Sequence, residues 1–241
     1  MDWTLVYIVA TILILPSFIY GSICQSNVYS TFETYAKVAS KSGLTAAELT
    51  DKLLKQAGIN DVEIAQINGK LTDCYDSKHK VIKLSNSTCG STSVASLGVC
   101  AHEVGHAIQD HQKSFLFRFR IFIAPILNFA SFAFIPLIFI GSILGFMFHI
   151  PVVGYWIIWA SVIMYGGSAF FSFITLPLEF DASKKALKML EETGVMNSEE
   201  LSQTKKVLKA AARTYIASFL TTLLYFLRFL SYALMVSGKR D

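Results

Sequence analysis

Two long segments without a charged residue restrict the possible folds of this chain more than any other feature. They run from residue 121 to 148 and from 151 to 178. A helix that crosses a bilayer needs about 20 apolar residues, so we expect two crossings joined by a turn at residues 149–151. Hydrophobic residues make up 53% of the chain and charged residues 16%, which is below the roughly 25% of soluble domains. We therefore expect a membrane protein.

Two more apolar segments lie near the ends of the sequence. Residues 3–22 carry no charge, follow no basic region and precede no small-x-small cleavage site, so we interpret them as a retained anchor that Pro16 kinks. Residues 214–236 are interrupted only by Arg228, which can snorkel or face a bundle interior. A fourth span and an interfacial helix both remain open there. The expected fold is mainly α, a multi-pass membrane protein with three to four transmembrane helices.

The polar regions between these spans have the patterns of a soluble domain. Thr45 and Glu48 form a capping-box pattern that begins a helix, and Gly58 ends it. VEIAQI (62–67) and KVIKLS (80–85) are typical of short strands between turns. We expect a small α+β unit here. The predicted segments are the anchor (1–22), the polar α+β segment (23–116), a transmembrane hairpin (117–178), a polar helical segment (179–212) and a C-terminal transmembrane helix with its tail (213–241).

The positions of lysine and arginine predict the orientation in the membrane. Residues 23–120 hold eleven of them and residues 178–213 hold seven, whereas the 149–151 turn and the N-terminus before the first span hold none. Positive charge favours the cytoplasmic side, so we expect both polar segments in the cytoplasm and the N-terminus outside. The net charge of +4 is small and scattered, and we expect no nucleic-acid partner.

SVASLGVCAHEVGHAIQDH, residues 93–111, contains the motif H-E-x-x-H. On a helix, His102 and His106 lie on one side and can both bind one Zn²⁺. Glu103 lies about 100° round the helix, where it can act as general base toward water that zinc activates. A chance match occurs in roughly one chain per hundred of this length, so the context must decide.

The first context is the helix that carries the motif. Both histidines project about 140° to 180° away from its apolar stripe, on the side of Gln109 and Asp110. A cleft and a solvated face would both look like this, and we favour metal ligands over surface histidines. The packed stripe consists of Val94, Leu97, Ala101, Val104 and Ile108.

A catalytic zinc usually has three protein ligands, so a third one is needed. In TLPLEFDASKKALKML (175–190), taken as a helix, Glu179 is centred on the apolar face, whereas Asp181 falls among lysines like an ordinary solvated carboxylate. Zinc would neutralise the buried carboxylate, and the alternative is a salt bridge to Arg213. The charge pattern puts Glu179 on the same side of the membrane as the histidines.

We therefore predict one catalytic Zn²⁺, with Glu103 as general base for peptide hydrolysis. The α+β segment 23–116 is then expected to be a small zincin-like cytoplasmic unit, and the cytoplasmic helical segment 179–212 supplies the third ligand. The predicted ligands are His102, His106 and Glu179. His79 and His111 are expected to have no metal role, and the four cysteines, which show no regular spacing, are expected to be free thiols. The candidate donors to an oxyanion are Tyr75, Arg213 and Tyr215, among which the sequence does not select.

At these residues the chain resembles the YugP-type family of "putative neutral zinc metallopeptidases", membrane proteins of bacteria. The similarity runs nearly end to end, through the N-terminal span, GLTAAEL, GKLTDCYDSKHKVIKLS, SVASLGVCAHEVGHAIQD, TLPLEFDASKKALKML and KKVLKAAARTYIASFL. It implies a zinc peptidase in the cytoplasmic membrane and supports the roles given above to the motif residues and Glu179. Cys74 departs from the family pattern, in which histidine is expected.

LEFDAS is also similar, more distantly, to the E-x-x-x-D element of the HtpX and CAAX-processing membrane proteases. In those enzymes the aspartate supports the site, and Ser183 stands at its position here. The residues that hydrogen-bond to the predicted zinc ligands must therefore differ from those of the HtpX and CAAX-processing proteases.

The expected partners are the lipid bilayer and a peptide or protein substrate, including a membrane-associated one. An extended substrate could add to an edge of the strands within residues 62–85. A zinc-binding scaffold or chaperone-like protein without turnover would not need Glu103, and a metal transporter would carry ionisable residues in its central spans, which have none. A zinc hydrolase of a non-peptide amide would use the same residues and remains an alternative.

Overall fold

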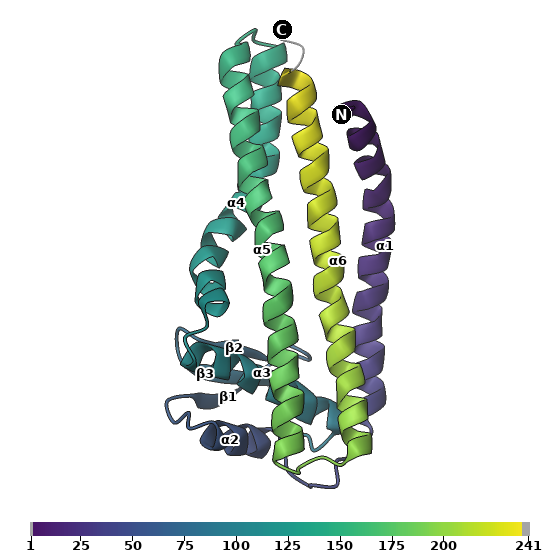
Figure 1. Ribbon diagram of the computed structural model, residues 1–241, viewed down its shortest axis with the longest axis vertical. Coiled ribbons are helices and arrows are strands. Elements are labelled where there is room, and N and C mark those ends of the chain that lie inside the picture. Colours follow the sequence, from purple (N-terminus) through teal and green to yellow (C-terminus); the bar gives the residue numbers. More distant parts are fainter. Residues whose placement is uncertain (1, 238–241) are drawn as a thin grey trace. The chain divides into compact units, whose positions relative to one another are not determined.

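The computed structural model describes residues 2–237, in which it contains six helices and three strands (Figure 1). Met1 of the predicted anchor and residues 238–241 of the predicted tail lie outside the described residues. The chain divides into two compact units. The apolar unit comprises the residues up to 23, residues 119–175 and the residues from 215 onward, and the motif unit comprises residues 24–118 and 176–214.

Four of the helices in the described chain are long and apolar enough to cross a membrane. They are α1 (Trp3–Ala36), α4 (Phe115–Phe146), α5 (Pro151–Glu192) and α6 (Ser198–Ser237). The turn predicted at residues 149–151 is present between α4 and α5, and Pro151 begins α5, where its missing N–H leaves no hydrogen bond unmade. Large apolar side chains such as Ile12 and Leu15 of α1 are exposed. The four apolar segments of the sequence are therefore helical, as expected.

Two of these helices are longer than the sequence analysis predicted. The predicted anchor stops at residue 22, whereas α1 continues without interruption through Pro16 to Ala36. The polar segment before residue 212 and the apolar segment after it form one helix, α6. Residues 23–36 and 198–237 contain no glycine or proline that would end a helix. Arg228 of α6 lies over the rings of Tyr7 and Phe229, at 5.5 and 5.9 Å from their centroids.

The motif unit begins with the predicted capping box. The hydroxyl of Thr45 accepts the backbone N–H of Glu48, whose carboxylate accepts the N–H of Thr45, and α2 (Ala46–Gln56) follows. Gly58 ends it with a positive φ of 71°, a conformation that glycine adopts without strain. The prediction of this helix is confirmed.

The sheet of the motif unit has three strands, although the sequence analysis expected two. The strands β1 (Glu63–Ile67) and β3 (Val81–Ser85) lie where they were predicted, and they pair in parallel. The additional strand, β2 (Cys74–Asp76), pairs antiparallel with β3 at the other edge, so the order is β1-β3-β2. A strand of three residues is too short to show the alternation that identifies strands in a sequence.

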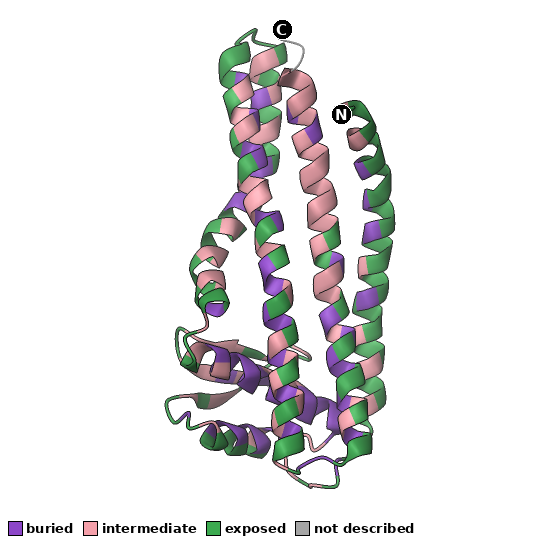
Figure 2. Cartoon of the chain, in the orientation of Figure 1, coloured by how far each residue is buried: buried purple, intermediate pink, exposed green. Residues whose placement is uncertain are grey.

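The helix α3 (Val94–His111) is buried on nearly all sides (Figure 2). Its predicted stripe is buried, but the opposite side, which carries the histidines, is also covered. The covering element is the end of α5 that belongs to the motif unit. A Cβ on Gly105 would lie only 2.6 Å from the carbonyl oxygen of Ala182 in α5, so the two backbones are in close contact. Of the two surroundings left open for the histidines, the solvated face is excluded, because they face another helix.

Replacing Gly105 by alanine should destabilise the protein, because the added methyl group would overlap the backbone of Ala182. Overpacking costs typically about 1–3 kcal/mol, and the gain in helix propensity offsets about 1 kcal/mol of it. We expect a lower midpoint of thermal unfolding in detergent. Gly90→Ala is the matched control, since no atom lies within 4 Å of a Cβ at that position. An unchanged midpoint for Gly105→Ala would contradict the close contact of α3 with α5.

Candidate metal centre

Three predicted metal ligands come together in the motif unit. His102 and His106 lie one turn apart on α3, and Glu179 lies on α5, with its side chain almost fully buried. The distance from Glu179 Oε2 to His102 Nε2 is 3.3 Å and that to His106 Nε2 is 3.4 Å. Their ligand atoms all lie within 4.8 Å of one another, and they form the one such group of three in the described chain.

Two of the distances among these atoms fit the ligand set of a zinc ion. Ligands arranged tetrahedrally at about 2.0–2.1 Å from zinc lie about 3.3–3.4 Å apart. A charge-assisted hydrogen bond between imidazole and carboxylate would be shorter, about 2.7–2.9 Å. The separations of 3.3 and 3.4 Å match the first geometry and are long for the second. Two imidazoles and a carboxylate are also a donor set that zinc prefers.

Gln109 fixes the orientation of His106. Its amide nitrogen donates to the carbonyl oxygen of Leu178, at 2.9 Å, and to Asp181 Oδ2, at 2.8 Å. Its amide oxygen, Oε1, then faces His106 Nδ1 at 2.9 Å. Because an amide oxygen only accepts hydrogen bonds, Nδ1 must be the donor. The hydrogen on His106 is therefore assigned to Nδ1, which leaves the lone pair of Nε2 free for a metal.

Ser183 has the corresponding position beside His102. Its hydroxyl oxygen lies 3.2 Å from His102 Nδ1, while Nε2 points to Glu179. Ser183 is the residue at which the sequence departs from the E-x-x-x-D element, and in this structure its hydroxyl contacts the ligand histidine directly. Both histidines thus use Nδ1 for support and direct Nε2 to the same carboxylate oxygen.

Asp181 was expected to be an ordinary solvated carboxylate, and this expectation is wrong. Its carboxylate is about half exposed, but it accepts the hydrogen bond from buried Gln109 and pairs with Lys185. The helical projection placed Asp181 correctly among lysines. It could not reveal the contact, because Gln109 approaches from α3, 72 positions earlier in the chain.

Glu103 is buried beside these ligands without belonging to the group of three. Its Oε2 accepts the backbone N–H of Tyr75 in β2 at 2.8 Å. Within the part of the chain that the structure describes, the other oxygen, Oε1, accepts no hydrogen bond, so one side of the carboxylate is fixed and the other is available to a proton. This arrangement suits a general base.

The hydroxyl of Tyr75, one of the candidate oxyanion donors, is hydrogen-bonded to Asp110. The phenol donates to Asp110 Oδ2 at 2.8 Å, and the same oxygen accepts Lys80 Nζ at 2.6 Å. Burial and the bond to Asp110 raise the pKa of Tyr75 above its usual range, so the phenol stays protonated and remains a donor. The sequence analysis missed that Tyr75 holds β2 against α3 through both its N–H and its hydroxyl.

Arg213 and Tyr215, the other candidate donors, both lie on α6. Arg213 lines a separate pocket of the motif unit, and Tyr215 belongs to the apolar unit. His79 Nδ1 contacts Asp76 Oδ2 at 2.9 Å, and all four cysteines are free. The expectations for the cysteines are therefore confirmed, and His79 belongs to no group of three metal-ligating residues in the described chain.

Comparisons with known proteins identify the family of the chain. The model of the family described as "Putative neutral zinc metallopeptidase" matches residues 10–234. The chain belongs to this family. It is also 38% identical over 208 residues to "Putative membrane protease YugP" of Bacillus subtilis (strain 168), a match that covers 85% of this chain and 88% of that protein. No solved structure matches the chain. The resemblance to the YugP-type zinc metallopeptidases is thus confirmed, and the family implies zinc.

Zinc binding by this chain should weaken as the pH falls. Burial lowers the pKa of His106, but the hydrogen bond to Glu179 and the charges of Glu103 and Glu179 raise it, and the net direction is upward. The titrating proton occupies Nε2, the atom that would bind zinc. Below the pKa of His106, the dissociation constant for zinc should therefore rise about tenfold per pH unit.

This pH dependence can be measured by competition with a chelator in detergent between pH 8 and pH 5. His79→Ala is the control, since His79 lies on a turn with Asp76 and should not alter the profile. A zinc dissociation constant that stays the same over this range would contradict the assignment of His106 as a ligand.

Proposed function

We propose that the protein is a membrane-embedded zinc metallopeptidase that hydrolyses peptide bonds. Membership in the zinc metallopeptidase family supports a zinc protease. The single observation that carries the finer proposal is the convergence of two Nε2 atoms and one buried carboxylate oxygen, with Glu103 beside them. His102, His106 and Glu179 would hold one Zn²⁺. When bound, zinc supplies a Lewis acid that polarises the scissile carbonyl and makes water a stronger acid.

Glu103 is the proposed general base. Because the Tyr75 N–H occupies Oε2, the proton from the attacking water goes to Oε1. The same oxygen then passes it to the leaving amine, so the carboxylate is regenerated after each cycle. Gln109 keeps a hydrogen on His106 Nδ1, which leaves Nε2 of that imidazole free to bind a metal, and the Ser183 hydroxyl contacts His102 Nδ1.

The proposed substrate is an extended peptide or protein segment that adds to β2. This strand is an edge of the sheet, since β3 pairs with one of its sides only. The backbone N–H of Tyr75 points away from β3 toward Glu103, so the free side of β2 adjoins the proposed base. Backbone pairing at such an edge is a common way to bind peptides of varied sequence.

The membrane part of the proposal rests on the four apolar helices and on the relative described as a membrane protease. The distribution of lysine and arginine supports a plasma-membrane protein with the motif unit on the cytoplasmic side. A scaffold that binds zinc without turnover would not require a buried carboxylate fixed beside the ligands. Hydrolysis of a non-peptide amide would use the same groups, and the free edge of β2 favours a peptide.

Glu103→Gln should bind zinc like the wild type and lose cleavage. The glutamine amide has the shape of the carboxylate and its oxygen can still accept the N–H of Tyr75, but it cannot take up the proton of the water. We expect the cleavage rate of casein or of a membrane-protein substrate to fall by about 10²- to 10⁴-fold. Zinc content and cleavage are measured on the same detergent-purified samples. Glu191→Gln, an exposed carboxylate on α5, is the matched control. Zinc-free wild type, or undiminished cleavage by Glu103→Gln, would overturn the proposal.

Tyr75→Phe tests whether the phenol stabilises the oxyanion. Because its hydroxyl donates to Asp110, we expect a loss of stability of about 0.5–1.5 kcal/mol and a rate of cleavage within a few-fold of the wild type. Removal of an oxyanion donor would instead lower kcat by about 10²- to 10³-fold. Thermal unfolding and cleavage assays on one preparation separate the two results.

A further inference from the structure

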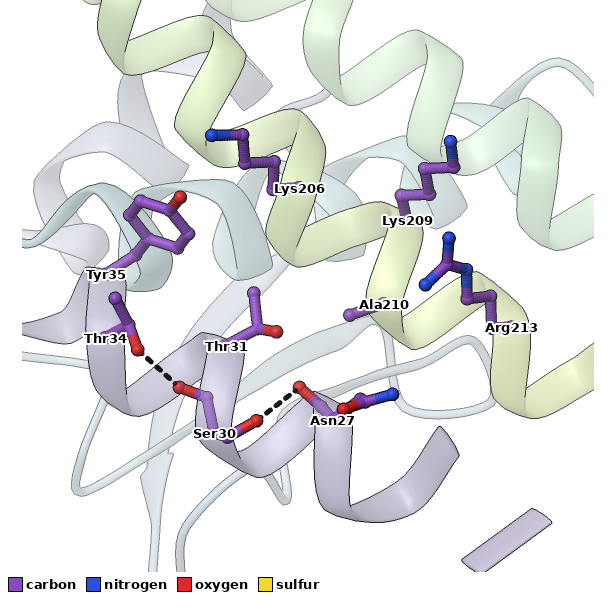
Figure 3. A pocket seen from close by; sticks show the side chains of 9 residues that line it. All are labelled: Asn27, Ser30, Thr31, Thr34, Tyr35, Lys206, Lys209, Ala210 and Arg213. Carbon is purple, nitrogen blue, oxygen red and sulfur yellow. Dashed lines mark hydrogen bonds between the residues drawn. The ribbon is translucent and has the colours of Figure 1, made fainter. Parts of the chain in front are cut away.

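A second site lies in the motif unit, in a pocket of about 520 Å³ between α1 and α6 (Figure 3). None of its lining residues belongs to the candidate metal centre. The lining side chains of α1 are polar, and those of α6 are mainly basic. They are Asn27, Ser30, Thr31, Thr34 and Tyr35 from α1, and Lys206, Lys209, Ala210 and Arg213 from α6.

The charge of this pocket is uncompensated. Lys206, Lys209 and Arg213 line it, and no acidic residue does. Lys206 lies over the ring of Tyr35, at 5.8 Å from its centroid, and none of the three cations forms a salt bridge within residues 2–237. Three like charges on two turns of one helix repel one another, so an anion in the pocket would be stabilising.

The hydrogen-bonding groups of the pocket suit a phosphate. The guanidinium of Arg213 offers a planar fork of donors, which matches phosphate oxygens, and the lysines add mobile point charges. The hydroxyls of Ser30 and Thr34 donate to carbonyls of their own helix, at 3.3 and 2.8 Å, and can rotate toward a ligand. Ala210 is the one aliphatic side chain of the lining, so the pocket offers little to an apolar side chain of a peptide.

The position of these residues along their helices indicates which phosphate-containing molecule lies near the pocket. Arg213 directly precedes the apolar segment 214–236, and Asn27 follows the apolar segment 3–22 by five residues of continuous helix. At about 1.5 Å per residue, the three cations lie roughly 1–12 Å along α6 from the start of its apolar segment. Lipid headgroups extend over about 5–8 Å on each side of the hydrocarbon core.

We propose that this pocket binds the phosphate of an anionic lipid headgroup. The inference goes beyond the proposed peptidase activity and uses from it only the membrane embedding of α1 and α6. A bound headgroup would neutralise the cations of α6 and bridge them to the polar side chains of α1. Anionic lipid would thereby stabilise the packing of these two helices in the motif unit.

The test compares wild type with the triple variant K206Q/K209Q/R213Q, both delipidated in detergent. Binding of phosphatidylglycerol is measured by native mass spectrometry, with phosphatidylcholine of the same chains in parallel. Each cation near an anionic headgroup contributes roughly fivefold in affinity, so the triple variant should bind phosphatidylglycerol on the order of 100-fold more weakly. Wild type should prefer phosphatidylglycerol to phosphatidylcholine, and phosphatidylglycerol should raise its thermal midpoint.

The variant K52Q/K78Q/K205Q is the matched control, because it removes the same charge from three exposed lysines that do not line the pocket. It should bind phosphatidylglycerol like the wild type. An equal loss in this control would overturn the proposal, since it would reveal attraction by net charge alone. Arg213→Lys keeps the positive charge but lacks the planar donors of the guanidinium, so it should bind phosphatidylglycerol with intermediate affinity. This variant replaces the triple variant if the triple variant does not fold.

Competition with inorganic phosphate tests whether the pocket binds the phosphate of a lipid headgroup or a free phosphate ion. Phosphate should compete with phosphatidylglycerol only weakly, because a free ion lacks the anchoring of the lipid chains. Phosphate that binds as tightly as the lipid would overturn the lipid assignment. Glu103→Gln should bind phosphatidylglycerol like the wild type, so failure of the peptidase proposal and failure of this one give different results in the same preparations.

Discussion

The motif unit is organised around one buried carboxylate, that of Glu179. An ionised carboxylate placed away from water without partners costs several kcal/mol, so its surroundings must compensate the charge. Two imidazole nitrogens of α3 lie 3.3 and 3.4 Å from it, and a cation held by these three groups would compensate the charge. This requirement brings α3 and α5 into contact, and Gly105 allows it because it has no side chain at the point where the backbones meet. The contact explains why the helix of the motif is buried on both sides.

The hydrogen bonds around the histidines form a chain that depends on the same contact. Gln109 reaches from α3 to the Leu178 carbonyl and to Asp181, and these two acceptors determine which end of its amide faces His106. The tautomer of the histidine therefore follows from the position of α5. Ser183, four residues beyond Glu179, contacts His102 in a comparable way. The helix α5 thus supplies the carboxylate, the Ser183 hydroxyl beside His102, and the two acceptors that position Gln109 against His106.

Much of this could be predicted from sequence because the deciding patterns are local. The capping box of α2, the stripe of α3 and the acid centred on an apolar face each depend on residues within a few turns. The roles of Asp181, Ser183 and Tyr75 could not be predicted, since each depends on a partner from another element. Strand β2 was missed for a related reason. Its three residues pair through backbone groups, which leave no trace in side-chain periodicity.

The length of the apolar helices links the two sites of the motif unit to the proposed membrane. Because α1, α5 and α6 continue beyond their apolar segments, their polar ends become part of the motif unit. Glu179 is the first residue after the apolar segment 151–178, and Arg213 is the last before 214–236. In the proposed topology, the third zinc ligand and the basic pocket both begin where the hydrocarbon core ends. A peptide bond that reaches Glu103 would then lie near the membrane surface, which favours substrates that are themselves held at the bilayer.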